Sequence, residues 1–395
     1  MRIEMKTRVF VITPDNFPPD IRIEREVRTL VNAGYEVFIC ASDETPTHYR
    51  TLNYHGAKVV YIGYRKFKGI PLLDWRKIFS ILYEVQPDII HIHNPQLYIQ
   101  ILVAIKKSRR KIKVIFDDHE LWTIYSLFYK TTPLLKLLLV LLFFILEFTA
   151  VKLSDIVITV SENMKKILVK LFRINENKVF SIENFEDIDM LSSLSSSSLL
   201  IDFKKDGDFI ICYMGGTEEH RGLKYLFQSL TYLKKDVVDR LRILIIGPMS
   251  KSLRENLLRL PTHISMKIFV TGFLPLKVAL NYLKCSDIAV ITYEKNPYTM
   301  YALPNKLCIY LYAKKPVIAT KLSALETYFD GSIYFVPEPK PHMLAEAISN
   351  LYQDENMRNK LSMLGYRLVI RKNNWKTISK KLLKIYKSLE TKRDL

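Results

Sequence analysis

Residues 302–320 read ALPNKLCIYLYAKKPVIAT and join a Pro-Asn-Lys turn to a helix and then to a short apolar strand at 316–319. Alternating helices and apolar strands are typical of parallel α/β sheets. The free N–H groups of a helix start attract anions, and Lys306 adds a full positive charge there. The stretch therefore predicts an anion-binding helix start within an α/β fold.

A second segment, residues 209–223, reads FIICYMGGTEEHRGL and predicts an apolar strand, a Gly-Gly turn and a cationic helix start. Gly215 and Gly216 let the backbone approach a ligand closely, and N–H groups left free at such a turn can hold phosphate oxygens. Arg221 and Gly222 open the next helix. An ordinary strand-to-helix loop would read much the same, so the phosphate prediction rests on both segments together.

In this order and spacing, the two segments resemble the donor site of retaining family-4-type (group 1) glycosyltransferases, which often read S-x-P-N-K-L-F-E-Y-M-A-x-G-x-P-V-I in the later segment. The resemblance implies an α/β protein of GT-B fold, with two Rossmann-like, doubly wound domains facing a cleft. It implies catalytic roles for His119, Arg221 and Lys306. It also implies a donor-binding set of Gly215, Gly216, Arg221, Gly272, Pro304, Asn305 and Lys306.

The chain departs from the family pattern at its pair of glutamates. Ile309 stands where the family has the second glutamate, and the first would fall at Tyr301. Glu294 offers a carboxylate in this region, but its spacing differs. Two functions therefore stay open: a retaining glycosyltransferase moving a sugar from a nucleotide diphosphate to an acceptor hydroxyl of a glycan or lipid, or a catalytically degenerate binding or scaffold subunit on the same fold.

Composition limits the domain count and the partners. A chain of 395 residues is long for one domain and suits two. Lys+Arg of 59 against Asp+Glu of 40 gives a formal charge of +19, which favours anionic partners such as nucleotide phosphates or acidic lipid headgroups. No nucleic-acid-binding motif is recognisable, so we expect no nucleic-acid partner.

Four cysteines without a C-x-x-C pair argue against a disulfide or metal framework, and the N-terminus lacks the pattern of a secretory signal. We therefore expect a cytoplasmic protein, with peripheral attachment to the inner face of the cell membrane as an open alternative.

Strand and helix patterns alternate from residue 8 to about residue 182, stop at a serine-rich stretch, and resume at residue 209. This break predicts an acceptor-side domain at 1–190, a linker at 191–208, a nucleotide-sugar-binding domain at 209–372 and a C-terminal helix at 373–395. In the resembled fold that helix often returns to the first domain. A dehydrogenase is disfavoured because residues 13–20, TPDNFPPD, lack the G-x-G-x-x-G fingerprint.

Residues 20–26, DIRIERE, follow the first strand and resemble a family pattern implied to recognise the acceptor. Asp20, Arg22 and Arg25 are the candidates. The alternative is that Asp20 caps a helix while both arginines are solvated.

His91 and His93 end one predicted strand, and residues 117–120, DDHE, end the next. Ligands bind at the carboxyl ends of parallel strands, so both positions suit a site. The resemblance implies that His119 approaches the donor sugar, whereas alternation places His91 and His93 on one strand face, where structural roles are favoured.

The segments lack the short ligand spacings of zinc motifs, and the resembled family generally works without metal, so we expect none. Asp187 and Asp189 form a D-x-D near the linker that we interpret as coincidental.

Residues 134–153, LLKLLLVLLFFILEFTAVKL, form a helix pattern that is apolar on all sides. Its longest uncharged run, 137–146, is about half of what spans a bilayer. Burial or packing against a partner, a membrane-spanning helix and a helix lying on an anionic membrane are the alternatives, of which spanning is disfavoured because it would split a Rossmann-like half.

Overall fold

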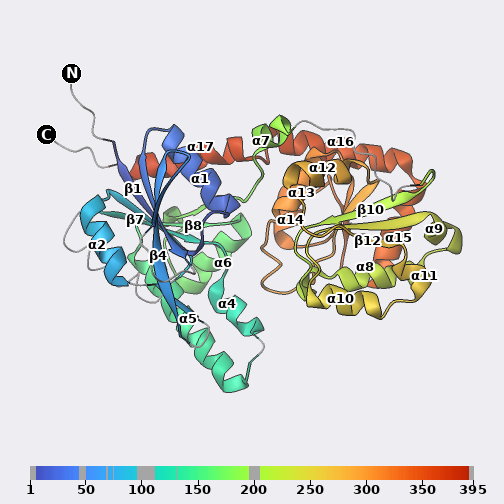
Figure 1. The fold of residues 1–395 in the computed structure, drawn as a ribbon, viewed down its shortest axis with the longest axis horizontal. Helices are drawn as coiled ribbons and strands as arrows, with labels where there is room; N and C mark the ends of the chain where they lie inside the picture. Colours follow the sequence, from blue (N-terminus) through green and yellow to red (C-terminus); the bar gives the residue numbers. More distant parts are fainter. Residues whose placement is uncertain are drawn as a thin grey trace. The chain divides into compact units, whose positions relative to one another are not determined.

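A computed structural model describes residues 6–43, 50–67, 70–73, 75–95, 112–129, 131–194 and 205–390. The chain forms two compact units: unit 1 is Met1–Glu183 with Ile378–Leu395, and unit 2 is Asn184–Thr377 (Figure 1). The units therefore divide just before residue 191, where the sequence predicts the start of the linker. Residues 195–204 of that predicted linker lie outside the described residues.

Unit 1 is built on one sheet with the order β3-β4-β2-β1-β6-β7-β8-β9, and β5 pairs with β4. The pairings are parallel except that β3 and β5 run antiparallel to β4. The strands are β1 (Arg8–Asn16), β2 (Glu36–Asp43), β3 (Arg50–Tyr54), β4 (Ala57–Phe67), β5 (Ile70–Leu73), β6 (Ile89–His93), β7 (Lys113–Asp118), β8 (Ile156–Thr159) and β9 (Val179–Ser181). The helices are α1 (Ile21–Asn32), α2 (Trp75–Val85), α4 (Trp122–Tyr125), α5 (Pro133–Leu153), α6 (Glu162–Phe172) and the part of α17 (Trp375–Leu389) from Ile378 onward.

Unit 2 has a second, separate sheet with the order β12-β11-β10-β13-β14-β15, all parallel. Its strands are β10 (Phe209–Met214), β11 (Leu241–Ile246), β12 (Ile268–Val270), β13 (Ile288–Ile291), β14 (Val317–Thr320) and β15 (Tyr334–Val336). Its helices are α7 (Ile188–Ser193), α8 (Leu223–Ser229), α9 (Lys235–Arg240), α10 (Lys251–Leu258), α11 (Thr262–Ser265), α12 (Leu276–Lys284), α13 (Asn305–Tyr312), α14 (Ser323–Phe329), α15 (Pro341–Gln353), α16 (Glu355–Arg371) and the start of α17. The predicted α/β class, with two separate parallel-type sheets, is confirmed.

Each sheet reverses its strand order once, and this reversal locates the candidate sites. In unit 1 the chain adds strands on one side of β1 and then continues on the other side with β6. In unit 2 the same reversal separates β10 from β13. Loops that leave the carboxyl ends of such a strand pair diverge to opposite faces, and ligands of open α/β sheets bind in the crevice between them. The central strands are almost fully buried, as a sheet covered on both faces requires, and in unit 1 they carry His91, His93, Asp117 and Asp118 among their apolar residues.

Helix α5 is the part of unit 1 that departs most from a normal core helix. Its buried residues, Leu146, Glu147, Ala150 and Val151, lie in its C-terminal half. The side chains of Leu137 and Leu141 are 66% and 54% exposed, and the N-terminal half extends beyond the sheet (Figure 1). Burial within the unit, one of the alternatives left open by the sequence, therefore does not hold for the first half of α5.

Candidate functional site

Glycines line the carboxyl edge of the unit 2 sheet. Gly215 follows β10 with φ of 109° and donates its N–H to the carbonyl of Ile246. A β-carbon at Gly247 would lie 2.1 Å from the Gly215 carbonyl oxygen, and one at Gly215 would lie 3.0 Å from the Lys306 Nζ. Only glycines allow this close approach of the two loops. Gly272 pairs with Gly247 through a bridge, so the predicted donor-binding Gly272 belongs to the same edge.

Lys306 enters this edge from the first turn of α13, which begins at Asn305 after Pro304. Its Nζ lies 3.9 Å from the ring centroid of Tyr213 and 5.4 Å from that of Tyr293. Within the described residues, the buried Nζ of Lys306 and the Oδ1 of Asn305 have no hydrogen-bond partner. Burial and the nearby charge of Arg221 hold the pKa of Lys306 well below the usual range of lysine.

Arg221 lies in the turn before α8, beside the same two tyrosines as Lys306. Its guanidinium carbon lies 4.7 Å from the ring centroid of Tyr293, and it donates a hydrogen bond to the hydroxyl of that tyrosine. Its Nε also lies 3.2 Å from Glu218 Oε2. Arg221 and Lys306 therefore converge on Tyr293, as the sequence predicted for two cations sharing one anion. Two like charges brought together in a partly buried site favour an anionic ligand.

Sequence reasoning missed three members of this cluster: Tyr213, Tyr293 and Glu218. Tyr213 is the penultimate residue of β10, and Tyr293 lies two residues beyond β13. Their positions at neighbouring strand ends were the available signal, since strand ends build the sites of parallel sheets. The sequence shows that Glu218 lies near Arg221 along the chain, but only the fold shows that its carboxylate pairs with Arg221.

The positions of the expected glutamate pair hold no carboxylate. Ile309 is 5% exposed within α13, and Tyr301 lies before that helix and is partly buried. Glu294 is held by two partners on α8: Lys224 Nζ lies 2.8 Å from its Oε1, and the hydroxyl of Tyr225 donates to the same oxygen at 3.0 Å. Glu294 thus lies beside the Arg221 loop, since its N–H donates to the carbonyl of His220.

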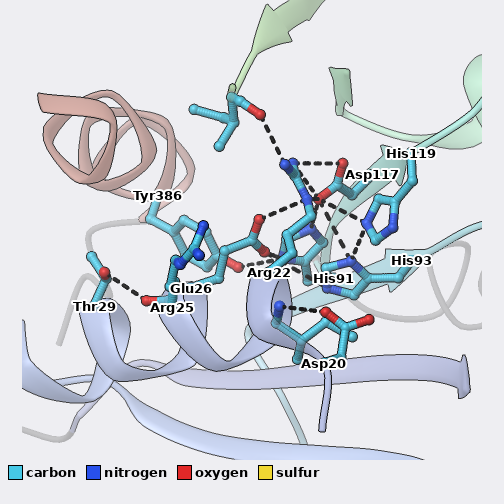
Figure 2. Close-up of polar contacts among 12 residues, drawn as sticks. Asp20, Arg22, Arg25, Glu26, Thr29, His91, His93, Asp117, His119 and Tyr386 are labelled. Carbon is cyan, nitrogen blue, oxygen red and sulfur yellow. Dashed lines mark hydrogen bonds and ion pairs between the residues drawn. The ribbon is translucent and has the colours of Figure 1, made fainter. Parts of the chain in front are cut away.

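In unit 1 the predicted acceptor residues lie at the start of α1 (Figure 2). Asp20 caps the helix and accepts a hydrogen bond from the N–H of Ile23 at 3.0 Å. Arg22 and Arg25 are only 4% and 3% exposed, so the alternative that both are solvated is wrong. Acceptor recognition by these residues stays a prediction.

Arg22 is the centre of a buried polar network. Its guanidinium makes hydrogen bonds of 2.8–3.0 Å to both carboxylate oxygens of Asp117, and another of 2.9 Å to the carbonyl of Ile182. Its Nε also lies 3.1 Å from Glu26 Oε1. The guanidinium lowers the pKa of Asp117 well below its usual range against the opposing effect of burial, while burial raises that of Glu26 well above it.

The histidines form a chain beside this network (Figure 2). His91 and His93 lie on one face of β6 with stacked rings 4.3 Å apart, as their spacing predicts. His91 Nδ1 lies 2.7 Å from the hydroxyl of Tyr386 on α17, and His93 Nδ1 lies 2.9 Å from His119 Nε2. The side chain of His119 is 18% exposed, against 1% for each of the other two. Of these three histidines, His119 is therefore the one that a ligand can reach most easily.

The D-x-D segment has a structural role. Asp187 caps α7 by accepting a hydrogen bond from the N–H of Met190, and Asp189 lies 3.7 Å from Lys376 Nζ. Both carboxylates lie in unit 2, away from its carboxyl sheet edge in sequence and in contacts.

Two family models match the chain, one for each unit. Glycosyltransferase Family 4 matches residues 21–189, and Glycosyl transferases group 1 matches residues 208–354. An uncharacterised glycosyltransferase of Methanocaldococcus jannaschii is 22% identical over 249 residues, which are 61% of this chain and 62% of that protein. The match therefore spans less than two thirds of that relative.

Solved structures of GT-B glycosyltransferases share the fold across nearly the whole chain. Sucrose-phosphate synthase of Thermosynechococcus elongatus is 13% identical with a TM-score of 0.70, covering 97% of this chain and 99% of that one. A glycosyltransferase of Rickettsia africae is 16% identical with a TM-score of 0.68, covering 97% and 98%. Anabaena HepE, solved with UDP-glucose, is 11% identical with a TM-score of 0.69, covering 96% and 99%.

Proposed function

Since the chain belongs to the glycosyltransferases of family 4 and group 1, with a GT-B fold, we propose that it transfers a sugar from a nucleotide-diphosphate donor to an acceptor hydroxyl with retention of configuration. The donor occupies the carboxyl edge of the unit 2 sheet. Anabaena HepE was solved with UDP-glucose, so UDP-sugars are the first donors to test.

The observation that carries this proposal is the convergence of Arg221 and Lys306 on Tyr293. Negative charge grows on the diphosphate as the bond to the sugar breaks, so fixed cations stabilise the transition state more than the ground state. The N–H groups that follow Gly215, together with those at the α13 start at Asn305, are the proposed hydrogen-bond donors to the phosphate oxygens. No metal is needed for this charge stabilisation.

His119 is the proposed contact for the donor sugar, because its imidazole is the exposed end of the histidine chain. A neutral imidazole nitrogen that carries its proton can donate a hydrogen bond to a sugar hydroxyl.

The replacement of the glutamate pair by Tyr301 and Ile309 favours one alternative, a protein that binds nucleotide but does not turn it over. Two measurements distinguish a transferase from a protein that only binds nucleotide. Thermal stabilisation by UDP and UDP-sugars tests donor binding, since a ligand at 100 times its Kd stabilises by about 2.7 kcal/mol. Slow hydrolysis of the bound UDP-sugar, lost in Lys306→Ala, supports the transferase. Thermal stabilisation without hydrolysis or transfer identifies the binding subunit. If every nucleotide sugar fails both to stabilise the protein and to be hydrolysed, the donor site is refuted.

We further propose that α5 docks on the surface of an anionic membrane, which would place the enzyme beside a lipid-linked acceptor on the inner face of the cell membrane. Among the described residues, α5 is the one helix long and apolar enough to cross a membrane. Crossing is disfavoured because α5 belongs to the connection between the parallel neighbours β7 and β8. Lys166 and Lys170 are exposed on α6, whose end packs against α5 through Phe172 and Phe144. An exposed apolar helix with basic neighbours is typical of interfacial attachment.

Vesicle co-sedimentation tests this attachment. Leu137→Ser/Leu141→Ser should lower binding to vesicles with anionic lipid by about tenfold, because two exposed leucines leave the apolar face. Leu258→Ser is the matched control, since Leu258 is 80% exposed on unit 2. Equal binding of wild type and double variant, with both folded by circular dichroism, would show that α5 faces a protein partner instead.

A further inference from the structure

The buried network of unit 1 contains a group of four side chains with the geometry of a metal site. Glu26, His91, His93 and Asp117 each offer one ligand atom, and these atoms lie within 4.8 Å of one another. All four side chains are at most 2% exposed. We propose that this cluster binds one divalent transition-metal ion, with Zn²⁺ as the best match to its ligands.

The backbone explains why these residues meet. Alternation along β6 places His91 and His93 on the same face, and their rings stack. In the β6–β7 ladder His93 pairs with Asp117, so the carboxylate stands beside the imidazole. Helix α1 supplies Glu26 from outside the sheet (Figure 2). Because three separate elements contribute, the sequence shows none of the short spacings that identify zinc motifs.

The distances suit a small ion. His91 Nε2 lies 3.7 Å from Asp117 Oδ2, and His93 Nε2 lies 3.7 Å from Glu26 Oε2. In a tetrahedral zinc site with bonds of about 2.0–2.1 Å, neighbouring ligand atoms stand about 3.4 Å apart. These two pairs are therefore only a few tenths of an ångström wider than in a filled site, and all four ligand atoms lie within 4.8 Å of one another.

The hydrogen-bonding pattern around the cluster also supports a metal site. In the described part of the chain, Nε2 of His91, Nε2 of His93 and both carboxylate oxygens of Glu26 are buried without a hydrogen-bond partner. Glu26 Oε1 lies 3.1 Å from Arg22 Nε, and Glu26 Oε2 lies 3.7 Å from His93 Nε2 and 3.9 Å from His91 Nδ1. Buried polar atoms are almost always hydrogen-bonded, so Nε2 of both histidines and Oε2 of Glu26 need an explanation. The opposite nitrogens of both imidazoles are engaged, by Tyr386 and His119, which is how metal-ligating histidines are oriented.

Two imidazoles and two carboxylates form a borderline ligand set that suits Zn²⁺ and excludes a thiolate-selective metal. Four protein ligands leave no open position, so the ion would fasten α1 to the sheet rather than bind substrate. Arg22 would orient the Asp117 carboxylate and share it with the ion, since its guanidinium donates to both Asp117 oxygens. The ion would also fix His93 with its proton on Nδ1, so that His93 donates to His119 Nε2 and sets the tautomer of the predicted sugar contact.

Metal binding by the untagged full chain tests the proposal. After chelator treatment and dialysis, the protein should bind one equivalent of Zn²⁺ in competition with a chromophoric chelator. Co²⁺ should give the intense visible absorption of a tetrahedral complex, and Zn²⁺ should displace it. Zn²⁺ should also raise the melting temperature of the apoprotein.

Glu26→Gln and His93→Gln should each weaken Zn²⁺ binding by about 100-fold, since even residues outside the ligand shell change affinity 10- to 100-fold. The exposed His263 provides the matched control His263→Gln, which should bind like wild type. The wild-type Co²⁺ spectrum keeps the test decisive where a variant fails to fold. No stoichiometric Zn²⁺ binding and no tetrahedral Co²⁺ spectrum would overturn the proposal and leave a metal-free network with Glu26 protonated. Donor binding in unit 2 is measured separately, so the two proposals fail independently.

Discussion

The arginines of the two units occupy equivalent places and have opposite surroundings. Arg22 and Arg221 both lie at the strand reversal of a parallel sheet, next to the carboxyl ends of its central strands. Arg22 is fully buried between Asp117 and Glu26. Arg221 stands with a second cation, Lys306, over aromatic rings, and its carboxylate partner Glu218 is 53% exposed. An arginine neutralised by buried carboxylates holds a fold together, whereas two cations with one partly exposed carboxylate are the arrangement proposed here to bind an anion.

The largest effect should come from replacing Arg22, the arginine that buried carboxylates neutralise. Arg22→Met leaves Asp117 buried and unpaired, which should lower the free energy of unfolding of unit 1 by about 3–5 kcal/mol. Arg221→Met should change it by about 1 kcal/mol or less, because its ion pair is partly exposed. Urea unfolding measures both variants. Asp117→Asn in the Arg22→Met background should recover much of the loss, and equal losses at the two arginines would contradict the distinction.

The next largest effect should fall on turnover. Arg221→Ala and Lys306→Ala should each raise the barrier by about 2.7–4 kcal/mol, or a hundredfold to a thousandfold in rate, by removing charge stabilisation from the leaving diphosphate. Arg221→Lys should also be impaired, since lysine lacks the planar fork of arginine. Steady-state kinetics with the cognate donor decide. Near-normal rates in both alanine variants would mean that the two cations bind no reacting anion.

A pH effect should follow from the lowered pKa of Lys306, which burial and Arg221 cause. Part of the lysine is neutral at alkaline pH in the free protein, and a bound diphosphate favours its charged form. UDP binding at about pH 8.5, where phosphate groups are fully ionised, should therefore take up protons, and affinity should fall as pH rises. Calorimetry in buffers of different ionisation enthalpy measures this uptake. Lys306→Met should abolish it; unchanged uptake in that variant would assign it to another group.

The smallest effect should come from the carboxylate partner in unit 2. Glu218 lies 3.2 Å from Arg221 and repels any anion bound there. Glu218→Gln should therefore tighten UDP binding, by about fivefold at most because an exposed pair contributes up to about 1 kcal/mol. Asp189→Asn, an exposed acidic change on α7, is the control for net charge. Weaker binding in Glu218→Gln would show that Glu218 contacts the nucleotide directly.

The sequence predicted the strand, turn and helix start of both proposed donor segments because this information is local. A glycine turn after an apolar strand and a cation at a helix start imply backbone geometry within a few residues. Residues 209–223 and 302–320 accordingly form the edges that bring Arg221 and Lys306 together. The Asp20 cap and the shared face of His91 and His93 were predictable for the same reason.

The remaining features depend on contacts between residues far apart in the chain. The burial of Arg22 follows from Asp117, 95 positions away, and the orientation of His91 follows from Tyr386, 295 positions away. Nothing within the D-I-R-I-E-R-E segment distinguishes an arginine that meets a buried carboxylate from a solvated one. Helix α5 shows the same limit, because its composition fits a core helix as well as an exposed one.

The sequence by itself thus determined the α/β class, the two sheets and the cations at the edge of the second, since periodicity and turn chemistry act over short distances. Only the tertiary structure decided which charges are matched, because the strand order brings α1, β6, β7 and α17 together in one unit and joins the ends of β10 and β13 with α13 in the other. Whether a charge is neutralised depends on its neighbours in space, and burial increases the interaction energy between the charges. The same residue type is therefore neutralised by buried carboxylates in unit 1 and lies beside a second cation in unit 2.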